Sequence, residues 1–172
     1  AWIPAECDVS IRPGWFYHEA EDSKVRTPEN LFDLWLKSVG GGANLLLNIP
    51  PDRRGKIHAT DSLALIEFRN LRDQNFGLNL ARSGTACFSP HSGLTPAPGL
   101  NDGNYNTAGT IFAPDRNALQ VVFKNSQRIN CIVLRENLSK GQACEKFTVR
   151  LMNGKHELLR EITGTTIGHK RI

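Results

Sequence analysis

The sequence predicts an α/β segment followed by an all-β segment. Residues 1–76 alternate between strand-like runs and helical periodicity, which is typical of an α/β fold. Residues 83–117 are rich in Gly, Pro, Ser, Thr and Asn, and short alternating runs follow at intervals of roughly 10–15 residues, as in a β-sandwich. The chain has 172 residues, 40% hydrophobic and 22% charged, which is ordinary for a globular protein and allows two partial domains.

The first helix is expected over residues 28–39. Thr27 is a good N-cap, and Pro28 suits the first helical position. An apolar stripe with helical spacing follows, and Gly40-Gly41-Gly42 ends it. The stripe contains Leu31, Phe32, Leu34, Trp35, Leu36 and Val39.

A strand and a second helix are expected next. Residues 43–49 are apolar on both faces and end at Pro50-Pro51, which predicts a strand of a parallel sheet covered by helices. The second helix should run over 61–75, with Thr60 or Asp61 as its cap. Upstream, residues 8–11 and 15–17 are expected to form short strand pieces.

The second half should form strands. The predicted strands are 119–123, 129–134, 147–151 and 158–162, each bounded by turn residues. Val121 and Phe123, or their alternates, should face one core.

Charge and cysteine content exclude several classes of protein. The net charge of +4 comes from scattered basic residues, whereas a nucleic-acid surface would usually cluster them. No apolar run approaches the roughly 18 residues that a membrane span needs. The four cysteines lack zinc-site spacing, so buried free thiols are expected, with disulfides as the alternative. They are Cys7, Cys87, Cys131 and Cys144.

Two long motifs resemble one enzyme family. The run 2–18 (WIPAECDVSIRPGWFYH) is similar to the end of the catalytic domain of α-L-fucosidases of glycoside hydrolase family 29, closest to the branch that acts on α-1,3/4-linked fucose. The run 38–55 (SVGGGANLLLNIPPDRRG) resembles the last barrel strand of that family and the turn after it. Residues 79–81, 102–107 and 129–136 resemble, more loosely, a discoidin-like (coagulation factor 5/8 C-type) sandwich.

This resemblance implies the C-terminal part of a (β/α)₈-type barrel over residues 1–77. Residues 78–172 would be an antiparallel β-sandwich truncated at its C-terminus. Chemistry in such a barrel occurs at the carboxyl ends of the strands. The family's retaining mechanism uses a nucleophilic Asp and an acid/base. Both are expected upstream of Trp2, so the chain alone should be inactive. The resemblance implies a fucosylated glycan as the substrate, and neither a cofactor nor nucleic acid as a partner. It also implies that the protein acts in the periplasm or outside the cell.

The resemblance also gives candidate site residues. Trp15 matches a family aromatic that packs against the apolar face of fucose, and the alternative is a core Trp. Glu6 would accept bonds from sugar hydroxyls or, less favoured, act as the catalytic acid; the structural alternative is an ion pair with Arg12. Arg12 and Asp8 would hold this loop.

Other candidates have simpler alternatives. His18 could bond a sugar hydroxyl, but a solvent-facing His is more common. Asn48 could approach the active face, although satisfying backbone groups at the strand end is favoured. Asp102 and Asn104 could bind calcium, but a plain turn is favoured, so no metal site is predicted.

The alternative function is a non-catalytic one. Residues 78–172 could be a carbohydrate-binding or purely structural module attached to an inactive barrel remnant. This part has five aromatic residues and no Trp, which argues against strong sugar binding by stacking. They are Phe88, Tyr105, Phe112, Phe123 and Phe147.

Overall fold

A computed structural model describes residues 3, 5–89, 95–109 and 118–172. Trp2 in the first motif and Phe112 lie outside these residues. The chain divides into two compact units: residues 1–77 with 131–146 and 165–172, and residues 78–130 with 147–164. The assignment of 1–77 and 78–172 to a barrel segment and a sandwich stays a prediction. In the described part of the chain, no helix has the length and apolar character to cross a membrane.

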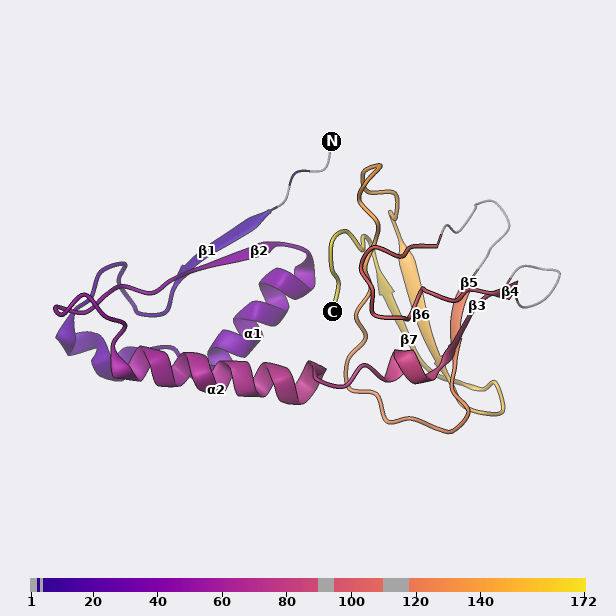
Figure 1. The fold of residues 1–172 in the computed structure, drawn as a ribbon, viewed down its shortest axis with the longest axis horizontal. Coiled ribbons are helices and arrows are strands. Elements are labelled where there is room, and N and C mark those ends of the chain that lie inside the picture. The colour runs from indigo at the N-terminus through magenta and orange to yellow at the C-terminus, as the bar shows by residue number, and fades with distance from the viewer. Residues whose placement is uncertain (1–2, 4, 90–94, 110–117) are drawn as a thin grey trace. The chain divides into compact units, whose positions relative to one another are not determined.

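The first unit contains a parallel pair of strands covered by helices. Strand β1 (Glu6–Ser10) pairs in parallel with β2 (Asn44–Asn48), from Glu6 opposite Asn44 to Ser10 opposite Asn48. Between them lie η1 (Glu19–Lys24), α1 (Pro28–Ser38) and η2 (Val39–Gly41). Helix α2 (Ala59–Phe76) follows β2. Figure 1 shows β1 beside β2, with both helices on one side of the pair.

The structure confirms the predicted start and end of the first helix. The Thr27 hydroxyl accepts a hydrogen bond from the Asn30 amide at 3.2 Å, and Pro28 begins α1. After η2 the chain turns at Gly42, whose φ of 91° lies in the left-handed region that favours glycine. Helix α2, however, is capped by His58, not by Thr60 or Asp61.

One apolar core joins the strands to the helices. Ile11, Leu31 and Ala64 are buried at its centre. Side chains from β2 and α2 surround them, so the face of the sheet that the helices cover is the buried one. These surrounding residues include Leu47, Ile49, Leu65 and Phe68, with Val25 from the loop before α1.

The second unit is built from short antiparallel strands. After η3 (Leu80–Ser83), the strands β3 (Thr85–Ser89), β4 (Thr95–Pro96) and β5 (Ala118–Val122) form one sheet in the order β4-β3-β5. Strands β6 (Phe147–Met152) and β7 (Leu158–Gly164) form a hairpin. The predicted strands near 119–123, 147–151 and 158–162 are therefore confirmed, whereas a closed sandwich stays a prediction.

Two predicted strands are wrong. Residues 129–134 alternate like a strand but have no ladder: their one bridge joins Leu134 to Arg171. A strand needs a partner along its length, and alternation alone does not provide one. Residues 15–17 form bends and coil instead of a strand, because side chains of β1 and β2 bind the backbone of this loop.

Candidate functional site

The candidate site lies at the carboxyl ends of β1 and β2. The Ile11 amide donates to the Asn48 carbonyl at 3.0 Å, so the two strands end side by side. The loop of residues 11–27 leaves β1 there, and the loop of residues 49–58 leaves β2 there. In (β/α)₈ barrels this end carries the chemistry.

Arg12 is the buried centre of the first loop. Its Nε donates to Asp61 Oδ2 at 3.0 Å, and its Nη1 donates to Asp22 Oδ1 at 2.8 Å. The side chains of Arg12 and Asp61 are both fully buried, and the guanidinium lies 4.7 Å from the centroid of the Tyr17 ring. Burial alone would lower the pKa of Arg12, but the two aspartates outweigh it and hold that pKa above its ordinary value. Arg12 thus joins the loop after β1 to the start of α2.

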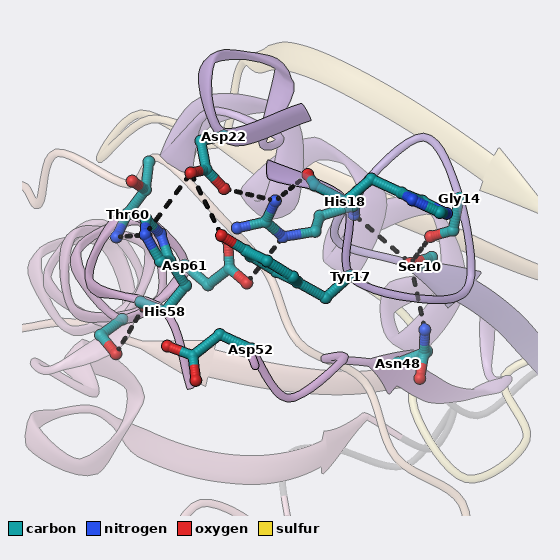
Figure 2. A network of polar contacts seen from close by, with 12 residues as sticks. Ser10, Gly14, Tyr17, His18, Asp22, Asn48, Asp52, His58, Thr60 and Asp61 are labelled. Atoms are coloured by element: carbon teal, nitrogen blue, oxygen red, sulfur yellow. Dashed lines mark hydrogen bonds and ion pairs between the residues drawn. The ribbon is translucent and has the colours of Figure 1, made fainter. Parts of the chain in front are cut away.

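Asp22 connects the loop after β1 to the loop after β2. Its Oδ2 accepts a hydrogen bond from the Tyr17 hydroxyl at 3.4 Å and lies 3.5 Å from His58 Nε2 (Figure 2). His58 Nδ1 accepts from the Thr60 amide at 3.3 Å, which caps α2. Burial, followed by the nearby Asp22 charge, raises the pKa of Tyr17, so its hydroxyl keeps its proton at neutral pH.

Asp52 stabilises the turn after β2. Its Oδ1 accepts from the Arg54 amide at 2.8 Å, and its Oδ2 accepts from Arg54 Nη2 at 2.6 Å. The Arg54 side-chain bond outweighs burial and lowers the pKa of Asp52 to about 2. The three aspartates of this face, Asp22, Asp52 and Asp61, are therefore each bonded to an arginine, and each serves to hold a loop in place.

The loop that carries Trp15 is fixed by Ser10 and Asn48. The Ser10 hydroxyl donates to the Gly14 carbonyl at 2.7 Å. Asn48 Nδ2 donates to the Trp15 carbonyl at 2.9 Å. It also donates to Ser10 Oγ at 3.2 Å (Figure 2). Trp15 is 50% exposed, so the structure presents an exposed residue with an indole on a loop that is held from both strands.

Glu6 lies at the opposite end of the strand pair. It is the first residue of β1, and its Oε2 accepts from Asn44 Nδ2 at 3.0 Å. The prediction that Glu6 lies at the carboxyl end of a strand is therefore wrong. The alternative ion pair of Glu6 with Arg12 is wrong too, because Arg12 binds Asp22 and Asp61. A substrate contact by Glu6 stays an untested prediction.

The remaining candidates take different places. Asp8 is exposed and outside the Arg12 network, so in the described contacts Arg12 holds the loop without Asp8. His18 contributes its backbone carbonyl, which accepts from Arg12 Nη1 at 3.4 Å, while the residue itself is exposed. Asn48 bonds a strand-end backbone group as predicted, through the Trp15 carbonyl.

Sequence reasoning missed the roles of Asp22, His58 and Asp61. Asp22 stood in an acidic run, Glu19 to Asp22, that reads as a solvated surface. Asp61 has the residue type and position of a helix cap, but it is 0% exposed because it pairs with Arg12. The two residues are 49 positions apart, and no local pattern connects them.

The candidates outside this face do not form a metal centre in the described residues. No group of three His, Cys, Asp or Glu side chains there could hold a metal ion. Asp102 Oδ1 accepts from the Asn104 amide at 2.6 Å, which is the turn that was favoured. All four cysteines are free thiols, but only Cys87 is buried, so full burial of the others was wrong.

Comparisons with known proteins find similarity to α-L-fucosidases. The sequence model of the α-L-fucosidase family matches residues 3–70. The chain is 35% identical over 181 residues to α-L-fucosidase 1 of Arabidopsis thaliana, covering 99% of this chain and 35% of that protein.

Solved structures of similar proteins include fucosidases as well. A glycoside hydrolase family 29 fucosidase of Ruminococcus gnavus in complex with fucose is 27% identical, with a TM-score of 0.84, over 99% of this chain and 35% of that one. The structure named SpGH29 is 34% identical, with a TM-score of 0.80, over 96% of this chain and 36% of that one. The chain is thus similar in sequence and in fold to about a third of these fucosidases. The chain spans about a third of the length of the curated relatives it matches.

Proposed function

We propose that this chain is part of a retaining exo-glycosidase that hydrolyses terminal α-L-fucose, α-1,3/4-linked, from glycans. The observation that carries the proposal is the half-exposed Trp15 at the carboxyl ends of two parallel strands. An indole offers a rigid apolar surface that suits the methyl group and C–H face of fucose. The family 29 neighbour whose structure contains fucose supports this sugar as the substrate.

The loop network serves binding through preorganisation. Ser10, Asn48 and the Arg12 network hold residues 11–18 before any sugar arrives, so little conformational entropy is lost on binding. A displacement of Trp15 by even about 1 Å would weaken catalysis, because the reacting bond must be positioned closely.

The catalytic carboxylates are proposed to lie outside this chain. A retaining enzyme needs two carboxyl groups about 5–5.5 Å apart, one nucleophile and one acid/base. Asp22, Asp52 and Asp61 are all bonded to arginines, and Asp52, with a pKa of about 2, is a poor proton donor at neutral pH. Glu6 lies at the other end of β1. These placements support a nucleophilic Asp and an acid/base upstream of Trp2.

The segments after residue 130 favour a bracing role over sugar binding. Within the first compact unit, Lys170 Nζ lies 4.5 Å from the Trp35 ring centroid, and the Ile172 amide donates to the Gly40 carbonyl at 2.9 Å. These contacts hold the end of α1 and η2.

We also propose that the enzyme acts in the periplasm or outside the cell, which cell fractionation tests.

The experiment is fucose release by the complete protein. It should hydrolyse α-1,3- and α-1,4-fucosylated oligosaccharides, and proton NMR of the first product should show the α-anomer of fucose. Purified residues 1–172 alone should release none. Turnover by the isolated chain would contradict the upstream placement, and a complete protein that releases no fucose would contradict the function.

A further inference from the structure

The side-chain amide of Asn48 has a fixed orientation. The Trp15 carbonyl can only accept, so the group 2.9 Å from it must be the NH₂ of Asn48. Ser10 donates its single hydroxyl proton to the Gly14 carbonyl at 2.7 Å, so Ser10 Oγ accepts the second amide hydrogen at 3.2 Å. Both hydrogens of Asn48 are therefore used within the loop. Its Oδ1 must point away from Ser10, as Figure 2 shows.

Asn48 Oδ1 is an acceptor without a donor among the described residues. Every hydrogen bond recorded for this side chain there uses Nδ2. The bond to Trp15 lies at an exposed position, so the amide is at the surface of this chain. A carbonyl oxygen held in one direction, on an amide that bonds the backbone of the exposed residue Trp15, is a preorganised acceptor.

We propose that Asn48 Oδ1 accepts a hydrogen bond from a hydroxyl group of the sugar bound beside Trp15. This inference rests on the proposed function and adds a residue that selects for that hydroxyl. A sugar presents an apolar C–H face and a rim of hydroxyls, so an indole and an amide oxygen at the same end of the strand pair match it together. The aspartates of the same face are bonded to arginines, whereas the Asn48 oxygen receives no described bond.

The proposed bond gives specificity more than affinity. A site built to bond a hydroxyl rejects the analogue that lacks it, because the acceptor is then left unpaired. Asn48 thus has two roles, with its nitrogen positioning the Trp15 loop and its oxygen contacting the substrate. The two roles predict different responses to substrate analogues, which makes them separable.

The test compares aryl α-L-fucoside with its 2-, 3- and 4-deoxy analogues in the complete enzyme. In the unaltered enzyme, loss of one hydroxyl should lower kcat/KM through this bond by roughly 10-fold, the size of a neutral hydrogen bond. In Asn48→Ala that penalty should disappear, relative to the parent fucoside. Ser10→Ala is the matched control, since it loosens the same loop but keeps the Asn48 oxygen and should keep the penalty.

Two outcomes would contradict the Asn48 contact, and a third would contradict the proposed function. A deoxy penalty that persists at full size in Asn48→Ala would overturn the contact and leave only loop anchoring. Tolerance of all three analogues by the unaltered enzyme would overturn it without any variant. If Asn48→Ala does not fold, kcat/KM of Asn48→Ser is measured on the same fucoside and its deoxy analogues. A complete enzyme inactive on every α-L-fucoside would instead refute the proposed function.

Discussion

Asp61→Asn should destabilise the chain much more than an ordinary surface substitution. Asp61 and Arg12 are both 0% exposed in their side chains and form a 3.0 Å pair that joins α2 to the loop after β1. Removing one partner of a buried pair typically costs about 3–5 kcal/mol, and the low end applies because Arg12 keeps Asp22. A loss of about 3 kcal/mol corresponds to a fall in Tm of about 6–12 °C for a chain of this size.

Guanidinium unfolding and thermal melting of residues 1–172 measure this effect. The control is Asp33→Asn, which breaks an i,i+4 pair with Lys37 whose side chains are 54% and 74% exposed. It should change little, since exposed pairs contribute almost nothing. The double variant Arg12→Met with Asp61→Leu should recover much of the loss. If Asp61→Asn matched Asp33→Asn in both assays, the Arg12 network would not hold the first unit together.

Two further predictions concern the turn after β2 and the sheet of the second unit. The pKa of Asp52 is lowered to about 2, so its contribution to stability is complete above its unfolded pKa of about 3.9 and is lost as the pH falls through about 2. Asp52→Asn should flatten the pH dependence of unfolding in that window, and an unchanged acid limb would contradict this. Gly84→Ala should destabilise the sheet, because its Cβ would stand 2.6 Å from a methyl carbon of Val121. Proteolysis of residues 78–130 would report this change, and equal protection in the variant would argue against it.

Local signals predicted the elements of the first unit. Thr27, Pro28 and the three glycines after residue 39 mark the bounds of α1 because capping and glycine conformations act over a few residues. The doubly apolar run before Pro50 predicted β2 and its parallel pairing. Such features depend on the nearest neighbours in the chain, so a single sequence contains them.

Pairing between residues far apart in the chain could not be predicted from the sequence. Residues 129–134 have the alternation of a strand, but only Leu134 has a bridge partner. The sequence pattern favoured an ion pair between Arg12 and Glu6, but the partners of Arg12 lie 10 and 49 positions away in the chain. Which carboxylate meets a buried guanidinium depends on how the loops pack, and neither composition nor periodicity contains that information.

The family motifs placed candidate residues at both ends of the strand pair. Trp15 and Asn48 both lie at the carboxyl ends of the strands, as the barrel resemblance required. Glu6 lies at the other end, because β1 begins at Glu6 and runs toward Ser10. Strand direction and the first residue of a strand are difficult to place in a run as irregular as residues 2–8.

The most direct test of sugar binding at this face is kcat/KM for an α-L-fucoside with Trp15→Ala in the complete enzyme. Loss of an indole surface should cost about 1–3 kcal/mol, or roughly 5- to 150-fold in kcat/KM. Ile66→Ala, which removes an exposed apolar side chain of α2, serves as the control and should leave kcat/KM unchanged. Melting temperature and active fraction are measured on the same preparations. The account predicts a large fall in kcat/KM per folded Trp15→Ala molecule, whereas normal kinetics with a lowered melting temperature would show that Trp15 is only structural.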